Sequence, residues 1–203
     1  ATLTWATTGA PAGTTVTYDV QYRAVTLSTT GTRLYSTPTT WYTHTTTKTG
    51  TISGTAGGVY QIQARTTDQY GTIGAWSPWT TVTMPIDDRA TSFGYTGTWT
   101  TGTSTSYYGG TYKLTSTPGA KVTVTAWTDQ VSVIGARSTT SGKATITIDG
   151  VVKATIDTYG ATAAYRQTLA TITVPYGEHT ITVTNLATTG RPRLNLDALA
   201  FRR

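Results

Sequence analysis

The stretch KVTVTAW at residues 121–127 alternates apolar side chains with threonine, and VSVIG follows at residues 131–135. Successive side chains of a strand point to opposite faces, so a period of two indicates one face in a core and one in water. The same alternation occurs in YDVQYR (18–23), VYQIQART (59–66) and HTITVT (179–184). Gly, Pro or Asp separate such runs roughly every 8–12 residues, which is typical of sandwiches and barrels. We therefore predict an all-β fold.

A tight turn is predicted where the run 144–149 (ATITID) ends. Gly150-Val151 separates this run from a further strand at 152–157, and Asp149 precedes the glycine. An Asp-Gly pair between alternating runs is a strong hairpin signal, because glycine adopts positive φ at little cost.

The alternation breaks near the middle of the chain, at MPIDDR in residues 84–89. Proline ends a strand, and an acidic pair favours a turn. The chain has 203 residues, which is enough for two sandwiches that each close a core. We therefore predict two domains, at residues 1–85 and 86–203.

Composition excludes several classes of function. There is no cysteine, so disulfides and thiolate metal sites are ruled out. The net charge is +6, yet only 12% of residues are charged and acids lie among the bases, which disfavours nucleic-acid binding. No apolar run approaches the roughly 18 residues that span a bilayer. Threonine forms roughly a quarter of the chain, and its branched side chain favours strands.

Residues 1–85 resemble a fibronectin type III domain of the kind found in actinobacterial secreted proteins. The matching segments are LTW (3–5), YDVQYR (18–23), Trp41, GGVYQIQARTTDQYG (57–71) and WSPW (76–79). The resemblance implies a spacer module with no ligand of its own, in which WSPW stacks on neighbouring side chains. It also implies that Tyr60 is a corner tyrosine whose hydroxyl bonds back to the chain.

One departure from that family concerns the first strand. LTW resembles the second strand of the fold, so the usual first strand is missing and one sheet is expected to have an open edge. Unpaired N–H and C=O groups at such an edge can pair with another strand. Self-association through this edge is therefore one of the interactions that the sequence predicts.

Residues 86–203 resemble a galactose-binding-like jelly roll, a β-sandwich common as an accessory domain of bacterial secreted hydrolases. The match extends over nearly the whole domain, and its segments are DDR (87–89), YTGTW (95–99), YYGGTY (107–112), GAKVTVT (119–125), VSVIG (131–135), GKATITIDG (142–150), YRQTL (165–169), GEHTITV (177–183) and LDALAF (196–201). The resemblance is specific for the fold and weaker for the ligand, because function lies in sites carried by a fold.

The jelly-roll resemblance implies a carbohydrate or cell-wall glycan partner. Aromatic side chains stack on sugar rings, and planar polar groups bond their hydroxyls. Tyr112 belongs to the wider set of aromatic residues that could serve. The candidate ligand-binding residues are Tyr107, Tyr108, Trp127, Arg137, Tyr159, Tyr165 and Gln167. Core packing or capping of the sandwich is the alternative role for each of them.

A structural calcium ion is a second expectation from the jelly-roll resemblance, which implies an ion joining the first and last strands. Asp87, Asp88 and Asp197 could supply the hard oxygen ligands that calcium prefers. The alternative is that these carboxylates only cap turns and accept hydrogen bonds.

Catalysis is not expected. The two histidines, His44 and His179, fall in different predicted domains, and no GxSxG or HExxH motif is present. Glycosidases need two carboxylates at a set separation in a cleft, and the sequence shows no such pair. We expect a non-catalytic, extracellular or cell-surface binding protein. A structural subunit of a fibre, filament or virion is the alternative, and an ice-binding surface is disfavoured because the threonines have no fixed period.

Overall fold

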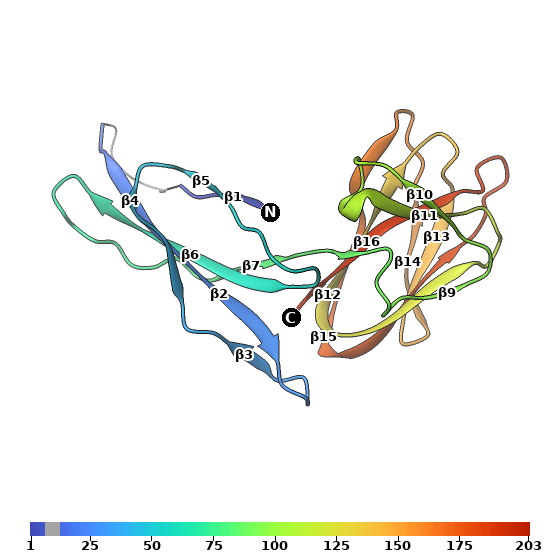
Figure 1. The fold of residues 1–203 in the computed structure, drawn as a ribbon, viewed down its shortest axis with the longest axis horizontal. Helices are drawn as coiled ribbons and strands as arrows, with labels where there is room; N and C mark the ends of the chain where they lie inside the picture. The colour runs from blue at the N-terminus through green and yellow to red at the C-terminus, as the bar shows by residue number, and fades with distance from the viewer. Residues whose placement is uncertain (7–12) are drawn as a thin grey trace. The chain divides into compact units, whose positions relative to one another are not determined.

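The computed structural model describes residues 1–6 and 13–203, and the chain divides into two compact units, Ala1–Met84 and Pro85–Arg203 (Figure 1). Nearly all regular structure is β, in antiparallel sheets, which confirms the predicted all-β fold. Among the described residues, no helix has the length and apolar character needed to cross a bilayer. The assignment of each unit to a particular module stays a prediction.

The first unit has two sheets of unequal size. Strands β2, β3, β4, β6 and β7 form a five-stranded sheet, in which β2 lies between β6 on one side and both β3 and β4 on the other. In the described part of the chain, strands β1 and β5 form a separate two-stranded sheet. The bounds are β1 Thr2–Thr4, β2 Val16–Leu27, β3 Arg33–Tyr35, β4 Thr39–Thr45, β5 Thr49–Thr51, β6 Val59–Asp68 and β7 Thr80–Thr83.

The core of the first unit lies between these sheets. Tyr18 and Val20 of β2 and Ile62 of β6 are buried there, and Leu3 and Trp5 pack against them from the β1 side. This pairing of a large with a small sheet leaves part of the larger sheet's inner face uncovered.

The WSPW segment lies along β6 and is held by stacking. The guanidinium of Arg65 lies 4.6 Å from the ring centre of Trp76, and that of Arg23 lies 4.2 Å from the ring centre of Trp79. Ser77 donates its backbone N–H to the Ala64 carbonyl, and its hydroxyl accepts from the Ala64 N–H. Cation–π contacts of this kind stabilise packing, so the motif has a structural role here.

In the second unit, two long bent strands run through the whole fold. The bounds are β8 Ile86–Asp87, β9 Gly94–Thr96, β10 Thr100–Thr103, β11 Thr111–Thr115, β12 Lys121–Arg137, β13 Lys143–Ile148, β14 Val151–Asp157, β15 Ala164–Asn185 and β16 Leu194–Arg202, with a 3₁₀ turn η1 at Tyr108–Gly110. The first half of β12 pairs with β9 and the second half with β16, while β15 pairs along nearly all of it. Each long strand therefore contributes to both layers of the sandwich.

The bend in β12 is stabilised by a buried hydroxyl. Pairing with β15 breaks between Thr128 and Gln130, and Thr128 is fully buried at this break. Its hydroxyl lies 2.7 Å from the Gln130 carbonyl and 2.8 Å from the Arg202 carbonyl, and it also accepts from the Gln130 N–H. The side chain thus supplies polar partners where the ladder is interrupted, which limits the cost of a buried bend.

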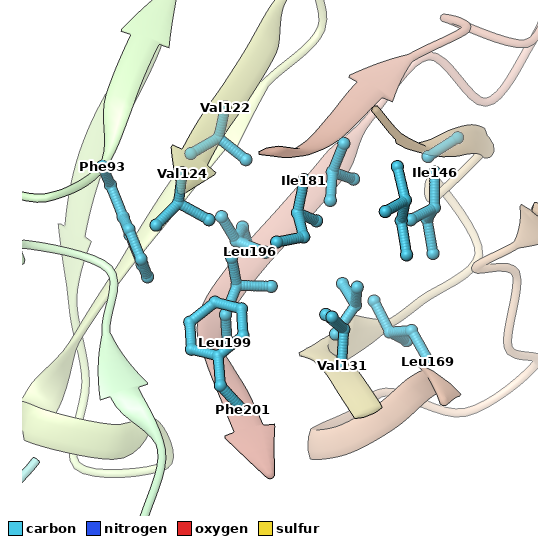
Figure 2. Packing of buried hydrophobic residues seen from close by; sticks show 14 of the residues in the cluster. Phe93, Val122, Val124, Val131, Ile146, Leu169, Ile181, Leu196, Leu199 and Phe201 are labelled. Atoms are coloured by element: carbon cyan, nitrogen blue, oxygen red, sulfur yellow. The ribbon is translucent and has the colours of Figure 1, made fainter. Parts of the chain in front are cut away.

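The apolar core of the second unit lies between its layers (Figure 2). The alternating positions predicted from the sequence point into it, as the picture shows for Val122 and Val124 of β12 and Ile181 of β15. Buried partners come from β13 and β16, including Ile146 and Leu199, which are completely inaccessible to solvent. Burying each such side chain contributes about 1.5–3 kcal/mol.

The predicted hairpin joins β13 to β14, one residue earlier than the sequence indicated. Ile148 pairs with Val151, so Asp149 and Gly150 are the two loop residues. Both have positive φ, 53° and 78°, as a type I′ turn requires.

Candidate functional site

A pocket of about 170 Å³ opens on the second unit beside β11, β12, β15 and β16. Three tyrosines line it: Tyr107, Tyr112 and Tyr165. We call it the tyrosine pocket. The rings of Tyr107 and Tyr112 stack with centres 4.3 Å apart and planes 26° apart, and Tyr165 meets Tyr107 edge-on at 5.2 Å. The pocket therefore has an aromatic wall of fixed geometry.

The two ends of this wall differ in exposure. Tyr107 is only 5% exposed, and its hydroxyl accepts a 3.0 Å hydrogen bond from the side-chain amide of Asn195. Burial raises the pKa of Tyr107 to about 12, so its phenol stays neutral. Tyr165 is 45% exposed and presents its ring to solvent. Tyr165 is therefore the solvent-accessible end of the aromatic wall.

Tyr112 reaches the pocket because its cross-strand neighbour is glycine. Gly102 of β10 pairs with Tyr112 of β11. A Cβ atom at position 102 would lie 2.2 Å from the tyrosine ring, so any other residue would displace it.

The lining of the pocket also includes polar and cationic residues. Arg137 and Arg193 line it, together with the hydroxyl side chains of Ser138, Thr140 and Ser141. Arg137 donates to the main-chain carbonyl of Asp157 at 2.9 Å. The Arg193 side chain is part of an exposed residue and has no hydrogen bond or ion pair with another described residue. No carboxylate is among the described residues that line this pocket, so its charge is positive.

The structure brings together three of the seven predicted ligand residues, Tyr107, Arg137 and Tyr165. Tyr159 is a near neighbour, because it forms a β-bridge with Ser138 of the rim. Its ring lies 4.9 Å from the guanidinium of Arg191.

The remaining three predicted residues lie outside the lining. Tyr108 packs against Ala198 and Ala200, and the Arg166 guanidinium lies 5.2 Å from its ring centre. Gln167 donates its side-chain amide to the Tyr165 carbonyl. Trp127 pairs with the ring of Tyr176, ten positions before Arg137 on the same strand. Ten residues of strand span up to about 33 Å, so Trp127 belongs to another part of the surface.

Sequence reasoning did not select Arg193 or Asn195. A signal for Asn195 was present, since it is a polar residue within a strand that otherwise reads as apolar, LNLDALAF. A polar side chain in a strand buried on both faces needs a partner, which Tyr107 supplies.

The predicted metal ligands form a second polar feature and are not among the residues that line the tyrosine pocket. Asp88 and Asp197 are both 0% exposed, and the Asp88 N–H donates to the Asp197 carbonyl at 3.0 Å. One oxygen of each carboxylate is bonded, to the Thr111 hydroxyl and the Tyr108 N–H respectively. The Oδ2 atoms of Asp87, Asp88 and Asp197 are buried without a partner.

These carboxylates disfavour each other's ionisation. Burial, aided by the charges of Asp88 and Asp87, raises the pKa of Asp197 to about 7, even though the Tyr108 N–H and Arg166 oppose the shift. Burial also raises the pKa of Asp88, with a smaller contribution from Asp87. A buried carboxylate either takes up a proton or needs a cation.

The fit of a metal ion to this feature is partial. Unpartnered hard oxygens are the donors that calcium prefers. Among the described residues, however, no three His, Cys, Asp or Glu side chains form a group that could hold a metal by themselves. A calcium ion at Asp88 and Asp197 would need main-chain carbonyls and water to complete its coordination.

Comparisons with known proteins show partial similarities. No family model matches it. It is 32% identical over 102 residues to an A type blood N-acetyl-alpha-D-galactosamine deacetylase of Flavonifractor plautii, and 32% identical over 98 residues to an A type blood alpha-D-galactosamine galactosaminidase of the same organism. The matches take in 50% and 48% of this chain but only 13% and 9% of those proteins.

Solved structures with a similar arrangement include the CBM36-1 domain of a multidomain xylanase from the hindgut metagenome of Trinervitermes trinervoides. It has a TM-score of 0.45 and 18% identity, over 60% of this chain and 98% of that one. A carbohydrate-binding module CBM36 in complex with calcium and xylotriose has a TM-score of 0.41 and 19% identity, over 58% of this chain and 97% of that one.

Proposed function

We propose that the second unit is a non-catalytic carbohydrate-binding module of an extracellular or cell-surface protein, and that its ligand enters the tyrosine pocket. The observation that carries the proposal is that Tyr107, Tyr112 and Tyr165 line one small concave site together with hydroxyl and guanidinium groups. Such a mixture of aromatic surface and a few convergent polar groups is what ligand pockets use. A volume of about 170 Å³ suits one sugar residue rather than a long chain segment.

The charge of the pocket narrows the ligand class. Arg137 and Arg193 face the site and no lining residue is acidic. A guanidinium binds a carboxylate through two parallel hydrogen bonds, which makes arginine well suited to acidic ligands. We therefore propose that the preferred sugar carries a carboxylate, as uronic acids do.

The absence of catalysis is supported by the burial of the acidic groups. Asp88 and Asp197 are the carboxylates with raised pKa values, but both are fully buried and cannot touch a substrate. The His179 ring lies 2.7 Å from the Asp149 carboxylate, and no serine or cysteine of the described residues forms a hydrogen bond with this pair. The two similar Flavonifractor proteins are enzymes by name, and the shared segment is a small part of each.

A glycan array probed with the full chain and with Arg193→Gln tests the function and its charge preference together. Binding to acidic glycans above neutral ones, with the preference reduced at least about tenfold in the variant, is the expected result. An array without signal for any glycan would rule the proposal out. Equal binding of acidic glycans by Arg193→Gln and the wild type would show that Arg193 does not contact the ligand.

Self-association is a second candidate, favoured by the edge of the first unit. Within the described part of the chain, strand β1 pairs with β5 and with no other strand. A groove of about 310 Å³ lies beside it, lined by apolar side chains such as Leu3, Trp5 and Ile62. Sedimentation velocity across a range of concentrations checks this. A sedimentation coefficient that rises with concentration in the wild type and stays constant in Thr4→Lys would support it, because a charge blocks edge pairing.

A further inference from the structure

We infer that the first unit has a ligand site of its own, for a neutral pyranose sugar, in a pocket of about 280 Å³ formed by Tyr22, Trp41 and Tyr60 with Thr51, Ile52 and Ser53. We call it the aromatic pocket. The inference goes beyond the proposed function, which gives a ligand only to the second unit.

The pocket exists because the two sheets of the first unit differ in width. The larger sheet is four strand positions across, about 14 Å at the usual spacing, whereas β1 and β5 together span about 5 Å. The small sheet therefore cannot cover the whole inner face of the larger one. On the side of β5, the segment that follows this strand lies over β2, β4 and β6 without filling the space.

Three aromatic rings line the aromatic pocket in this uncovered space. Tyr22 of β2 lies between the other two, with its ring centre 6.3 Å from that of Trp41 and 6.4 Å from that of Tyr60. The planes meet at 81° and 66°, so the rings meet edge to face, and all three are partly buried against the core of the first unit. Ile52, which is buried, supplies an apolar surface between them.

The polar atoms of these rings are available to a ligand. The indole N–H of Trp41 and the hydroxyls of Tyr22 and Tyr60 have no hydrogen bond to another described residue, and none of them is a fully buried atom. Trp5, in the same core, differs, because its indole N–H donates to the Thr47 carbonyl at 2.8 Å. The fibronectin resemblance implied a bond from the Tyr60 hydroxyl back to the chain, and no described residue makes that bond.

The composition of the lining selects the ligand. No charged side chain is among the described residues that line the aromatic pocket, in contrast to the two arginines of the tyrosine pocket. Aromatic faces pack against the C–H surface of a sugar ring, and an indole N–H, phenols and the Thr51 and Ser53 hydroxyls can bond its hydroxyl groups. A neutral pyranose combines these two kinds of surface, whereas a charged ligand would lose hydration without gaining a partner.

NMR titration of the full chain tests the inference, with the indole N–H signal of Trp41 identified by its loss in Trp41→Phe. Methyl glucopyranosides and methyl galactopyranosides are added at millimolar concentrations. We expect a saturable shift of the Trp41 signal. The affinity obtained from this shift should be about threefold to tenfold lower in Tyr60→Phe, which loses one hydroxyl but keeps the ring. Ser53→Arg should abolish the shift, because its guanidinium would cover the aromatic rings.

Tyr70→Phe, at a tyrosine that is 83% exposed and outside the pocket, is the matched control and should bind like the wild type. No Trp41 shift with any of these sugars, or a shift that Ser53→Arg retains, would overturn the inference. The same titrations in Tyr165→Ala separate the two sites. If Trp41 responds there unchanged, the aromatic pocket binds independently of the second unit, whatever the outcome for the proposed function.

Discussion

At the scale of single residues, the tyrosine pocket depends on a contact that joins distant parts of the chain. Tyr107 and Asn195 are 88 positions apart, and their hydrogen bond fixes the buried end of the aromatic wall. The sequence marks Tyr107 as an aromatic candidate, but no local pattern places it beside Asn195 or separates its role from that of Tyr108. Pairing of this kind is decided by strand register, which a single sequence specifies only weakly at long range.

Asp197 gives a prediction for calcium and for pH at this scale. Its pKa is raised to about 7, above the value of 3.8 for an unperturbed aspartate. A group with a raised folded pKa contributes stability that is present below the unfolded pKa and lost as pH rises through the folded value. Without added metal, we therefore expect the free energy of unfolding of the wild type to fall between about pH 4 and pH 7 relative to that of Asp197→Asn, in urea titrations.

Calcium should reverse that loss if it binds at Asp88 and Asp197. A ligand that binds only the folded state raises the unfolding midpoint with its concentration. We expect added Ca²⁺ to stabilise the wild type near pH 8 and to leave Asp197→Asn unchanged. Equal stabilisation of both proteins would place calcium elsewhere, and none in either would exclude it from these carboxylates.

His179 gives a second pH prediction. Its ring nitrogens lie 2.7 Å from the Asp149 carboxylate and 2.8 Å from the Pro175 carbonyl, which raises its pKa above the ordinary 6.5. The contribution of protonated His179 to the free energy of unfolding is therefore complete below pH 6.5, and it is lost as pH rises through the higher pKa of the folded state. Urea midpoints of the wild type and His179→Gln should differ at pH 5.5 and converge at high pH, and a difference that is independent of pH would contradict this.

At the scale of elements, the strands can be predicted from the local sequence pattern, whereas the bends cannot. Alternation in 121–127 and 131–135 predicts two strands, whereas β12 is one strand from Lys121 to Arg137 that passes through both layers. The joining residue, Thr128, looks like every other threonine in the sequence. The sequence predicts both Trp127 and Arg137 as ligand residues, because two separate short strands could bring the end of each to the same place. In the structure both residues lie on one long strand, which keeps them apart.

Thr128→Val tests whether the bend in β12 needs the threonine hydroxyl. The substitution keeps the shape and removes the hydroxyl that serves Gln130 and Arg202, which leaves polar groups unpaired, at a cost of about 1–3 kcal/mol. Thr125→Val is the matched control on the same strand, because its hydroxyl is exposed and meets only that of Thr180. Its cost should stay below about 0.5 kcal/mol. Chemical denaturation measures both, and equal costs would show that the bend does not need the hydroxyl.

At the scale of the whole molecule, the two units carry pockets of different chemistry. The tyrosine pocket combines aromatic rings with two arginines, and the aromatic pocket has no charged lining residue. Composition alone could not reveal this division, because the arginines and tyrosines are spread along the chain. The all-β class, by contrast, is visible in the sequence, since every strand with one buried face repeats the same period.

The most direct test of the central claim is a calorimetric titration of the best glycan from the array into the wild type and Tyr165→Ala. Tyr165 is the exposed wall of the tyrosine pocket, so its truncation removes ligand contact while the buried Tyr107–Asn195 bond remains. Tyr70→Ala, an exposed tyrosine of the first unit, serves as the control. We expect at least about tenfold weaker binding for Tyr165→Ala and none of this loss for Tyr70→Ala. Unchanged affinity in Tyr165→Ala would contradict it.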